Sequence, residues 1–103
     1  MERTKILQLL GLANRAGKIV SGYSEVLHKL QQEKIMMVFV ANDASDKTKQ
    51  TFQNKCTHYK VELYLDFSTE ELSHAIGKEM RKILAVTDLG FYKTLKEKLN
   101  RGE

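Results

Sequence analysis

Residues 36–41 form the continuous apolar run MMVFVA, which is typical of a strand buried on both faces of a sheet. The residues that follow, NDAS at positions 42–45, favour a turn, and Ser45 is placed to cap a helix beginning after it. A second run of the same character, KILAVTD, occupies residues 82–88. We therefore predict buried strands at both places.

Helical and extended patterns alternate on either side of these runs. Residue spacing and capping signals predict helices over residues 2–16, 24–32, 46–58, 70–76 and 90–99, and short strands over 18–21 and 61–65. Gly17 and Gly77 stand at helix ends, and either Ser68 or Thr69 can cap the fourth helix. Alternation without a linker or repeat predicts one α/β domain over residues 1–103, with a central sheet sandwiched between helices.

The composition narrows the class of protein. The chain has 103 residues and 42% hydrophobic content, enough for one core. Cys56 is the single cysteine, so an internal disulfide is excluded, and we expect its side chain to pack in the interior. A reducing cytoplasm is the expected location of the protein. No apolar run reaches the roughly 18 residues of a membrane span, and no signal peptide is recognised. The formal net charge of +4 is compatible with an anionic partner.

The stretch GKIVSGYS, residues 17–24, spaces its glycines like the phosphate-binding P-loop, G-x-x-x-x-G-K-[ST]. Tyr23 stands where that loop needs lysine, Lys18 lies at the wrong end, and the stretch follows an amphipathic helix instead of a long buried strand. We therefore reject a P-loop and give Tyr23 no role. Gly22 before a helix start allows an anionic backbone to approach the free N–H groups of the first turn, although a simple strand-to-helix turn is an equal alternative.

No catalytic or metal-binding pattern is found in the sequence. His28, His58 and His74 lie far apart, and none belongs to an H-x-x-x-H or H-E-x-x-H motif. Each is expected on the surface of a helix. We predict no catalytic residue, no metal and no cofactor.

Two further loops carry side chains suited to RNA. Asn42 follows a buried strand and can donate to and accept from a base edge, with Lys47 and Lys49 on the next helix. In KEMRK, residues 78–82, basic side chains flank Met80. Basic groups for phosphates around an apolar side chain for an unstacked base are common where proteins bind single strands or RNA loops. Taken alone, each segment is also what an ordinary solvated surface looks like.

The chain resembles the ribosomal-protein superfamily of L-seven-Ae and L-thirty-e, whose members bind kink-turn RNA, and within it a small bacterial branch called YlxQ. The resemblance is carried by GKIVSGYSE, MMVFVAND, KCTHYKVELY, ELSHAIGK and RKILAVTD, with LGLANRAGK and AVTDLGF towards the two ends. It covers nearly the whole chain. It implies a three-layer α/β/α sandwich with a mixed four-stranded sheet and a noncatalytic protein.

In this family, the second helix enters the widened major groove of a sharply bent RNA at tandem sheared G·A pairs. By resemblance, Gly22 is the glycine that permits this approach. Ser24 and Glu25 fall on an Asn-Glu pair that reaches purine edges in archaeal members, and Glu25 keeps the carboxylate. His28 falls where a family lysine meets phosphate, and Lys18 matches a basic position before the first strand.

The same resemblance implies RNA contacts for residues of the other two loops. Asn42 and Lys47 match polar contact positions, while Met80 falls on a position that packs against an extruded base, with Arg81 beside it. Ser73 replaces a usual glycine before this loop. The resemblance implies RNA as partner, ribosomal RNA included. The small size and the lack of an obvious exposed apolar stripe predict a monomer, and no membrane partner is expected. Ser24 and His28, the two departures in the second helix, leave open a protein-interaction module on the same fold that has lost its RNA site.

Overall fold

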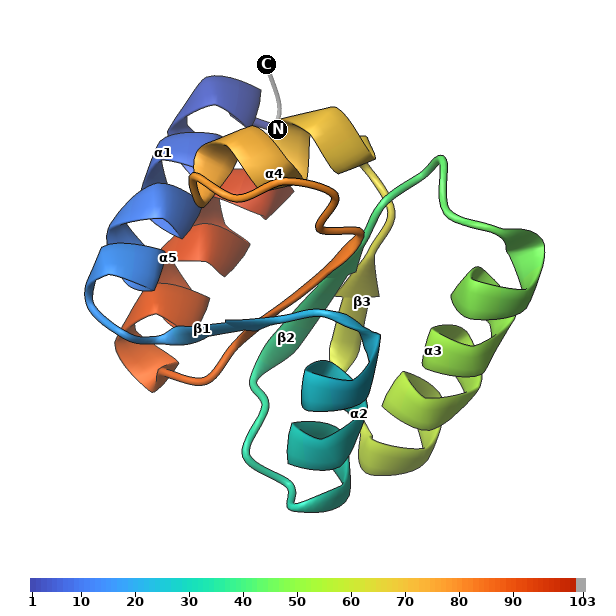
Figure 1. Cartoon of the computed structure of the whole chain (residues 1–103). Helices are drawn as coiled ribbons and strands as arrows, with labels where there is room; N and C mark the ends of the chain where they lie inside the picture. Colours follow the sequence, from blue (N-terminus) through green and yellow to red (C-terminus); the bar gives the residue numbers. More distant parts are fainter. Residues whose placement is uncertain (102–103) are drawn as a thin grey trace.

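The two apolar runs form the central strands of the sheet, β2 (Met37–Val40) and β4 (Ile83–Val86), and every residue of both strands is buried. They pair antiparallel, with Val40 opposite Ile83. The flanking strands are β1 (Ile19–Ser21), antiparallel to β4, and β3 (Glu62–Tyr64), parallel to β2. The strand order is β1-β4-β2-β3, so the predicted mixed four-stranded sheet is confirmed (Figure 1).

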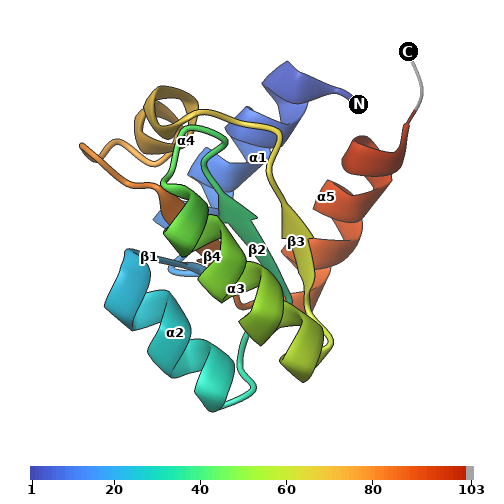
Figure 2. The same cartoon turned by 90° about the vertical axis from the view of Figure 1, so that its right-hand side faces the viewer.

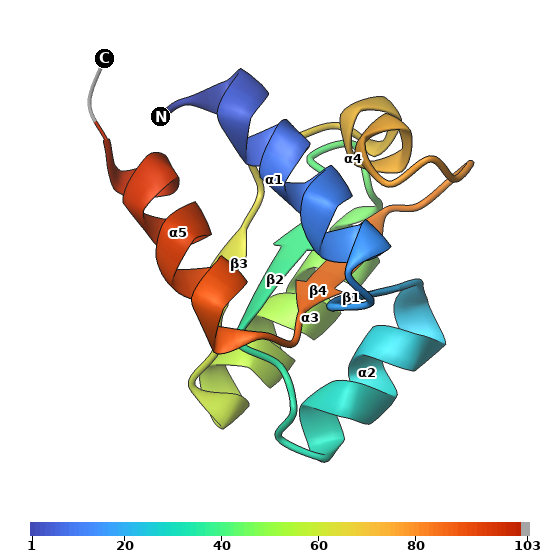
Figure 3. The same ribbon diagram turned by 90° about the vertical axis from the view of Figure 1, so that its left-hand side faces the viewer.

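Helices cover both faces of this sheet in the computed structural model, which describes residues 1–101. One layer contains α1 (Arg3–Arg15), α4 (Thr69–Ala75) and α5 (Leu89–Asn100) (Figure 3). The other contains α2 (Tyr23–Gln31) and α3 (Asp46–Tyr59), side by side (Figure 2). The predicted α/β/α sandwich is therefore confirmed. Within residues 1–101, no helix combines the length and apolar character needed to cross a membrane.

The helix and strand bounds differ from the predicted ones by no more than two residues at any end, as expected where ends fray. Ser45 caps α3 as predicted, because its hydroxyl accepts a hydrogen bond from the Thr48 N–H at 3.1 Å. Ser68, not Thr69, is the cap of α4. The second helix begins one residue before its predicted start, so Tyr23 is its first residue.

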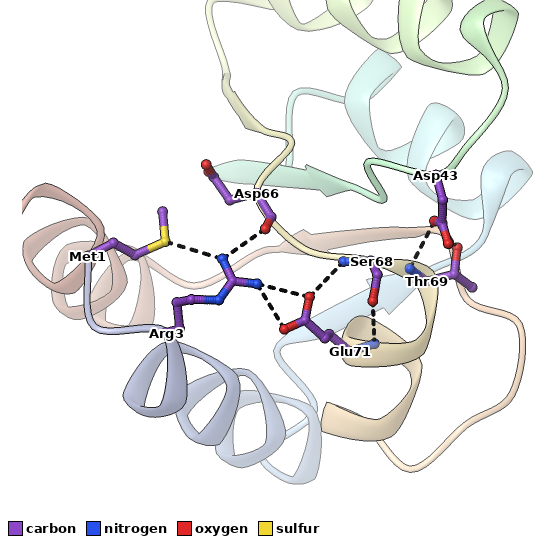
Figure 4. Close-up of polar contacts among 7 residues, drawn as sticks. All are labelled: Met1, Arg3, Asp43, Asp66, Ser68, Thr69 and Glu71. Carbon is purple, nitrogen blue, oxygen red and sulfur yellow. Dashed lines mark hydrogen bonds and ion pairs between the residues drawn. The ribbon is translucent and has the colours of Figure 1, made fainter.

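The cap of α4 belongs to a network that ties three segments together (Figure 4). Ser68 and Glu71 form a capping box, in which each side chain accepts from the other's backbone N–H. The guanidinium of Arg3 donates to both oxygens of Glu71, at 2.9 and 2.8 Å, and to the carbonyl of Asp66 at 3.0 Å. These bonds join α1, the β3–α4 connection and α4. The pKa of Glu71 lies below its usual value because of the Ser68 N–H and the Arg3 guanidinium.

The register of the sheet brings three loops to one end. Strands β1 and β2 both run antiparallel to β4, so their carboxyl ends lie beside the amino end of β4. Two backbone bonds fasten this end, from the Gly22 N–H to the Ile83 carbonyl at 2.9 Å and from the Ala41 N–H to the Lys82 carbonyl at 2.7 Å. Helices α2 and α3 also begin here (Figure 2). We call residues 22–25, 42–47 and 77–82 the loop-end surface.

Candidate nucleic-acid interface

At Gly22, helix α2 begins without a side-chain cap on the loop-end surface. It is the N-cap of α2 with φ 98° and ψ 155°, a backbone conformation reached almost only by glycine. No side chain caps α2, so the N–H groups of its first turn remain available. These donors and the positive end of the helix dipole form a site that favours an anion.

The predicted base-reading residues lie on the outer side of α2. Val26 and Leu30 are fully buried, which turns Ser24, Glu25 and His28 outward. Ser24 and His28 are one turn apart and therefore share a face. The structure thus brings this part of the predicted site together on one exposed helix surface.

His28 is engaged within its own helix. Its Nε2 atom lies 3.2 Å from Nε2 of Gln32, so one ring nitrogen is used in a contact one turn further along. Ser24 has a short exposed side chain beside it. Both side chains are shorter than the asparagine and lysine that the resemblance predicts at these positions, so both offer less reach towards a ligand.

The α4–β4 loop is held by the serine that departs from the family pattern. Ser73 is buried, and its hydroxyl accepts from the Arg81 N–H at 2.7 Å while donating to the Arg81 carbonyl at 3.2 Å. Met80 directly precedes Arg81 in this loop, with φ 53° and a 74% exposed side chain. The hydroxyl thus fixes the loop that presents Met80 to the solvent.

The side chain of Arg81 joins this loop to the start of α2. Its Nη1 atom lies 3.4 Å from the point that a Cβ atom on Gly22 would occupy. The Nε atom is buried without a hydrogen-bond partner, and no carboxylate of residues 1–101 forms an ion pair with this guanidinium. A cation beside the positive end of a helix is unfavourable unless an anion compensates both. The arrangement is therefore suited to bind a phosphate group.

Asn42 and Lys47 lie on the second loop of the surface. Both are exposed, and Lys47 is the second residue of α3. The backbone of Asn42 donates to the Phe67 carbonyl at 2.9 Å. Its neighbour Asp43 accepts from the hydroxyl and N–H of Thr69, at 2.6 and 3.0 Å, and these bonds hold the Asp43 pKa below its usual value (Figure 4). This loop is therefore fixed against the start of α4.

Lys18 does not join the loop-end surface. It precedes β1, whose first residue, Ile19, pairs with Val86 at the far end of β4. Gly22 lies four residue steps after Lys18 along extended chain, a span on the order of 13 Å. A ligand that touches both residues would have to extend along the length of β1.

Tyr23 belongs to the surface, although the sequence analysis gave it no role. Its side chain is 45% exposed, and its ring meets the buried ring of Phe52 edge to face, with centroids 5.1 Å apart and an 84° interplanar angle. An aromatic residue directly after the helix-start Gly22 was the signal available in the sequence.

No three His, Cys, Asp or Glu side chains within residues 1–101 are grouped to hold a metal ion. Cys56 is buried, which raises the pKa of its thiol to about 11 and keeps it protonated and unreactive. Its predicted packing role is confirmed.

A family profile described as Ribosomal protein L7Ae/L30e/S12e/Gadd45 matches residues 4–96. The chain belongs to this family. It is 42% identical over 95 residues to the RNA-binding protein YlxQ of Enterococcus faecium, a match covering 92% of this chain and 91% of the relative. The RNA-binding protein YlxQ of Bacillus subtilis (strain 168) is 43% identical over 83 residues, covering 81% and 83%. The predicted resemblance is confirmed.

Solved structures of the same fold include proteins from distant organisms. A protein of unknown function from Bacillus halodurans C superposes with a TM-score of 0.90 at 32% identity, covering 94% of this chain and 98% of the other. The 15.5kD RNA binding protein of Giardia lamblia has a TM-score of 0.81 at 18% identity, covering 96% and 86%. The second likeness bears on the fold alone. The L7Ae/L30e/S12e/Gadd45 family fold is thus retained in this chain from α1 to α5.

Proposed function

We propose that this chain is a noncatalytic RNA-binding protein of the cytoplasm that recognises and stabilises kink-turn-like RNA containing tandem G·A pairs. Membership of the family and the names of two relatives support RNA as the partner. The proposed target is ribosomal RNA or a structured regulatory RNA, bound by a monomer. The proposed contacts are Lys18, Gly22, Ser24, Glu25, His28, Asn42, Lys47, Met80 and Arg81.

One observation carries this proposal. The unpartnered guanidinium of Arg81 lies against Gly22 at the uncapped start of α2. Helix N–H groups and guanidinium together form a phosphate site of two chemically different donors. Glu25 lies one turn or less away and offers a carboxylate that accepts from the exocyclic amino group of guanine. The surface therefore pairs a phosphate contact, which positions the RNA, with a base contact, which selects it.

The shape of the RNA decides whether α2 can reach its bases. The major groove of regular A-form RNA is too deep and narrow for side chains to enter. A sharp kink at G·A pairs opens that groove, so a protein that enters with a helix binds the bent form and not the straight one. Binding only one form shifts the RNA population towards it. In this proposal the protein acts as a clamp on RNA folding.

A mobility-shift titration tests the proposal. One RNA carries a kink-turn, and its matched control has the G·A pairs replaced by Watson–Crick pairs with the same length and loop. We expect clear preference for the kink-turn at fixed salt, since salt alone changes affinity strongly. Equal affinity for the two RNAs would refute specific recognition, although general RNA binding would survive.

A second candidate is a protein-interaction module on the same fold. The contact of His28 with Gln32 on the surface of α2 and the short side chain of Ser24 favour it, because both weaken the base-reading face of the helix. Capture of partners from lysate with and without RNase separates the two candidates. A defined protein partner that remains after RNase, combined with no preference in the RNA titration, would favour this module.

A further inference from the structure

We propose that the ring of Tyr23 is a stacking platform for an unstacked base of the bound RNA. This inference rests on the proposed function and adds a base-binding residue to it. Tyr23 is the first residue of α2, directly beside the helix start that faces the ligand. Its side chain is 45% exposed, so part of the ring is open to a ligand.

The orientation of the ring is fixed before any ligand binds. Phe52 on α3 is fully buried, and its ring meets that of Tyr23 edge to face. In such a pair, Phe52 covers at most one face of the tyrosine ring, so at least one face is not in contact with Phe52. A ring that is already held loses little conformational freedom when a base stacks on it.

The immediate surroundings of Tyr23 favour a nucleic acid as the occupant. Tyr23 is the first residue of α2, so its side chain leaves the positive end of that helix, and α3 begins at the same end of the sheet (Figure 2). The cationic side chains of Lys47 and Arg81 belong to the same loop-end surface. The same surface also carries four carboxylates, those of Glu25, Asp43, Asp46 and Glu79, so its overall charge does not decide the occupant. What favours a nucleic acid is local: an exposed aromatic ring directly after the glycine that the Arg81 guanidinium contacts can hold an unstacked base beside a phosphate contact. An acidic protein partner would use the charges but has no base to place on the ring.

Met80 offers a second apolar contact on the same surface. It is 74% exposed and precedes Arg81, whose guanidinium lies against Gly22. Tyr23 follows Gly22 directly, so the two exposed apolar side chains leave from segments that meet at this glycine. The surface thus has places for two different unstacked nucleotides, as a kinked RNA with splayed bases requires.

The test measures affinity and stacking separately. A kink-turn RNA carries 2-aminopurine, whose fluorescence falls on stacking, at each unpaired nucleotide in turn. Tyr23→Phe keeps the ring, whereas Tyr23→Leu keeps apolar volume against Phe52 without an aromatic face. We expect Tyr23→Leu to weaken binding about 5- to 100-fold, which corresponds to roughly 1–3 kcal/mol, and to abolish quenching at one position. Tyr23→Phe is expected to retain both.

A control variant separates this effect from general loss of apolar surface. Leu89 is 50% exposed and is likewise the first residue of its helix, α5, at the other end of β4. We expect Leu89→Ala to bind RNA like the wild type. Thermal unfolding of each variant checks that it is folded at the temperature of the titration.

The outcomes distinguish this inference from the function on which it rests. If the wild type prefers the kink-turn but Tyr23→Leu binds equally well with unchanged quenching, the stacking role is wrong and the proposed function stands. If the wild type ignores the G·A pairs, the proposed function fails. The same variants on single-stranded RNA carrying 2-aminopurine then decide the role of Tyr23, and absence of binding or quenching there overturns it too.

Discussion

The guanidinium of Arg81 packs against Gly22, with Nη1 3.4 Å from the point that a Cβ atom on the glycine would occupy. At this distance a Cβ would make an ordinary van der Waals contact, so sterics alone do not exclude a side chain. The backbone conformation disfavours a side chain at this position, because residues other than glycine rarely adopt φ 98° with ψ 155°. The contact therefore combines a turn that requires glycine, a helix start and an unpaired cation in one place.

Replacement of Gly22 by alanine is expected to lower the free energy of unfolding by about 1–3 kcal/mol, the strain of that backbone conformation. Urea denaturation measures this change. The added Cβ also narrows the approach to the first turn of α2, so RNA binding should weaken beyond what the loss of folded protein explains. Gly17→Ala is the matched control, because Gly17 also has positive φ, 74°, but lies outside the loop-end surface with no atom near its Cβ position. RNA affinities that fall equally in the two variants would contradict a role for Gly22 in binding.

Replacement of Glu25 by alanine should relax the discrimination between a kink-turn and its G·A-disrupted control. The expected cost is about 1–3 kcal/mol on the kink-turn alone, since a base contact contributes only where the correct base is present. Paired titrations against the two RNAs give the ratio directly. Glu97→Ala removes a carboxylate of similar exposure from the last turns of α5 and should leave the ratio unchanged. Equal losses on both RNAs would show that Glu25 reads no base.

The layers and strands of this fold were predictable because local patterns carry them. Continuous apolar runs such as 82–88 become central strands, and Val26 and Leu30 repeat at the spacing that buries one side of α2. Caps act within a few residues, so Ser45 was also predictable. Strand order and direction were not derivable in this way, because they depend on pairings between residues far apart. Family resemblance supplied the mixed sheet in their place.

The residues of the candidate site were predictable from the family resemblance, but the contacts between them were not, because those contacts depend on how distant segments pair. Resemblance placed Gly22 and Arg81 on one interface, but their contact exists only because β4 inserts between β1 and β2 with a particular register. The bonds from Ser73 to the backbone of Arg81 likewise join positions eight residues apart across a loop. Lys18 was grouped with these residues by motif, whereas the length of β1 separates it from them.

Removal of single lysines should reveal how far the RNA extends over the protein. Lys47→Ala is expected to weaken binding to every RNA tested and to reduce the slope of log affinity against log salt by about 1, the effect of one lost phosphate contact. Lys18→Ala is predicted to do the same through a nucleotide further along β1. Titration across several salt concentrations gives both slopes, with Lys93→Ala on α5 as control. An unchanged slope for Lys18→Ala would remove Lys18 from the interface.

Loss of the Ser73 hydroxyl should loosen the loop that carries Met80. Ser73→Ala leaves the Arg81 N–H without its 2.7 Å acceptor in a buried position, at an expected cost of about 1–3 kcal/mol in unfolding free energy. Hydrogen exchange should increase selectively at residues 77–82. Thr94→Ala removes an exposed hydroxyl that bonds only a carbonyl of its own helix, and should change stability by less than about 0.5 kcal/mol. Unaltered exchange in the loop would show that other contacts hold it.

The bonds of Glu71 predict how stability changes with acid. The Ser68 N–H and the Arg3 guanidinium lower its pKa from the usual 4.5 in the folded protein. A lowered folded-state pKa stabilises the protein above about pH 4.5, and this contribution is lost as the pH falls through the folded-state value. Glu71→Gln keeps the capping shape without the charge, so wild type and variant should differ in unfolding free energy near neutral pH and converge in acid.

Urea denaturation of the wild type and Glu71→Gln at a series of pH values measures this convergence. Glu70→Gln removes the same charge from the same exposed helix turn without breaking the bonds to Arg3 or Ser68, so the comparison isolates the bonded carboxylate. We expect the Glu71 variant to lose more stability than the Glu70 variant at neutral pH. A constant difference between wild type and Glu71→Gln at every pH would mean that shape, and not charge, supplies the contribution of Glu71. The link from α1 to the start of α4, which carries the Thr69 bonds to the Asn42 loop, would then be independent of pH.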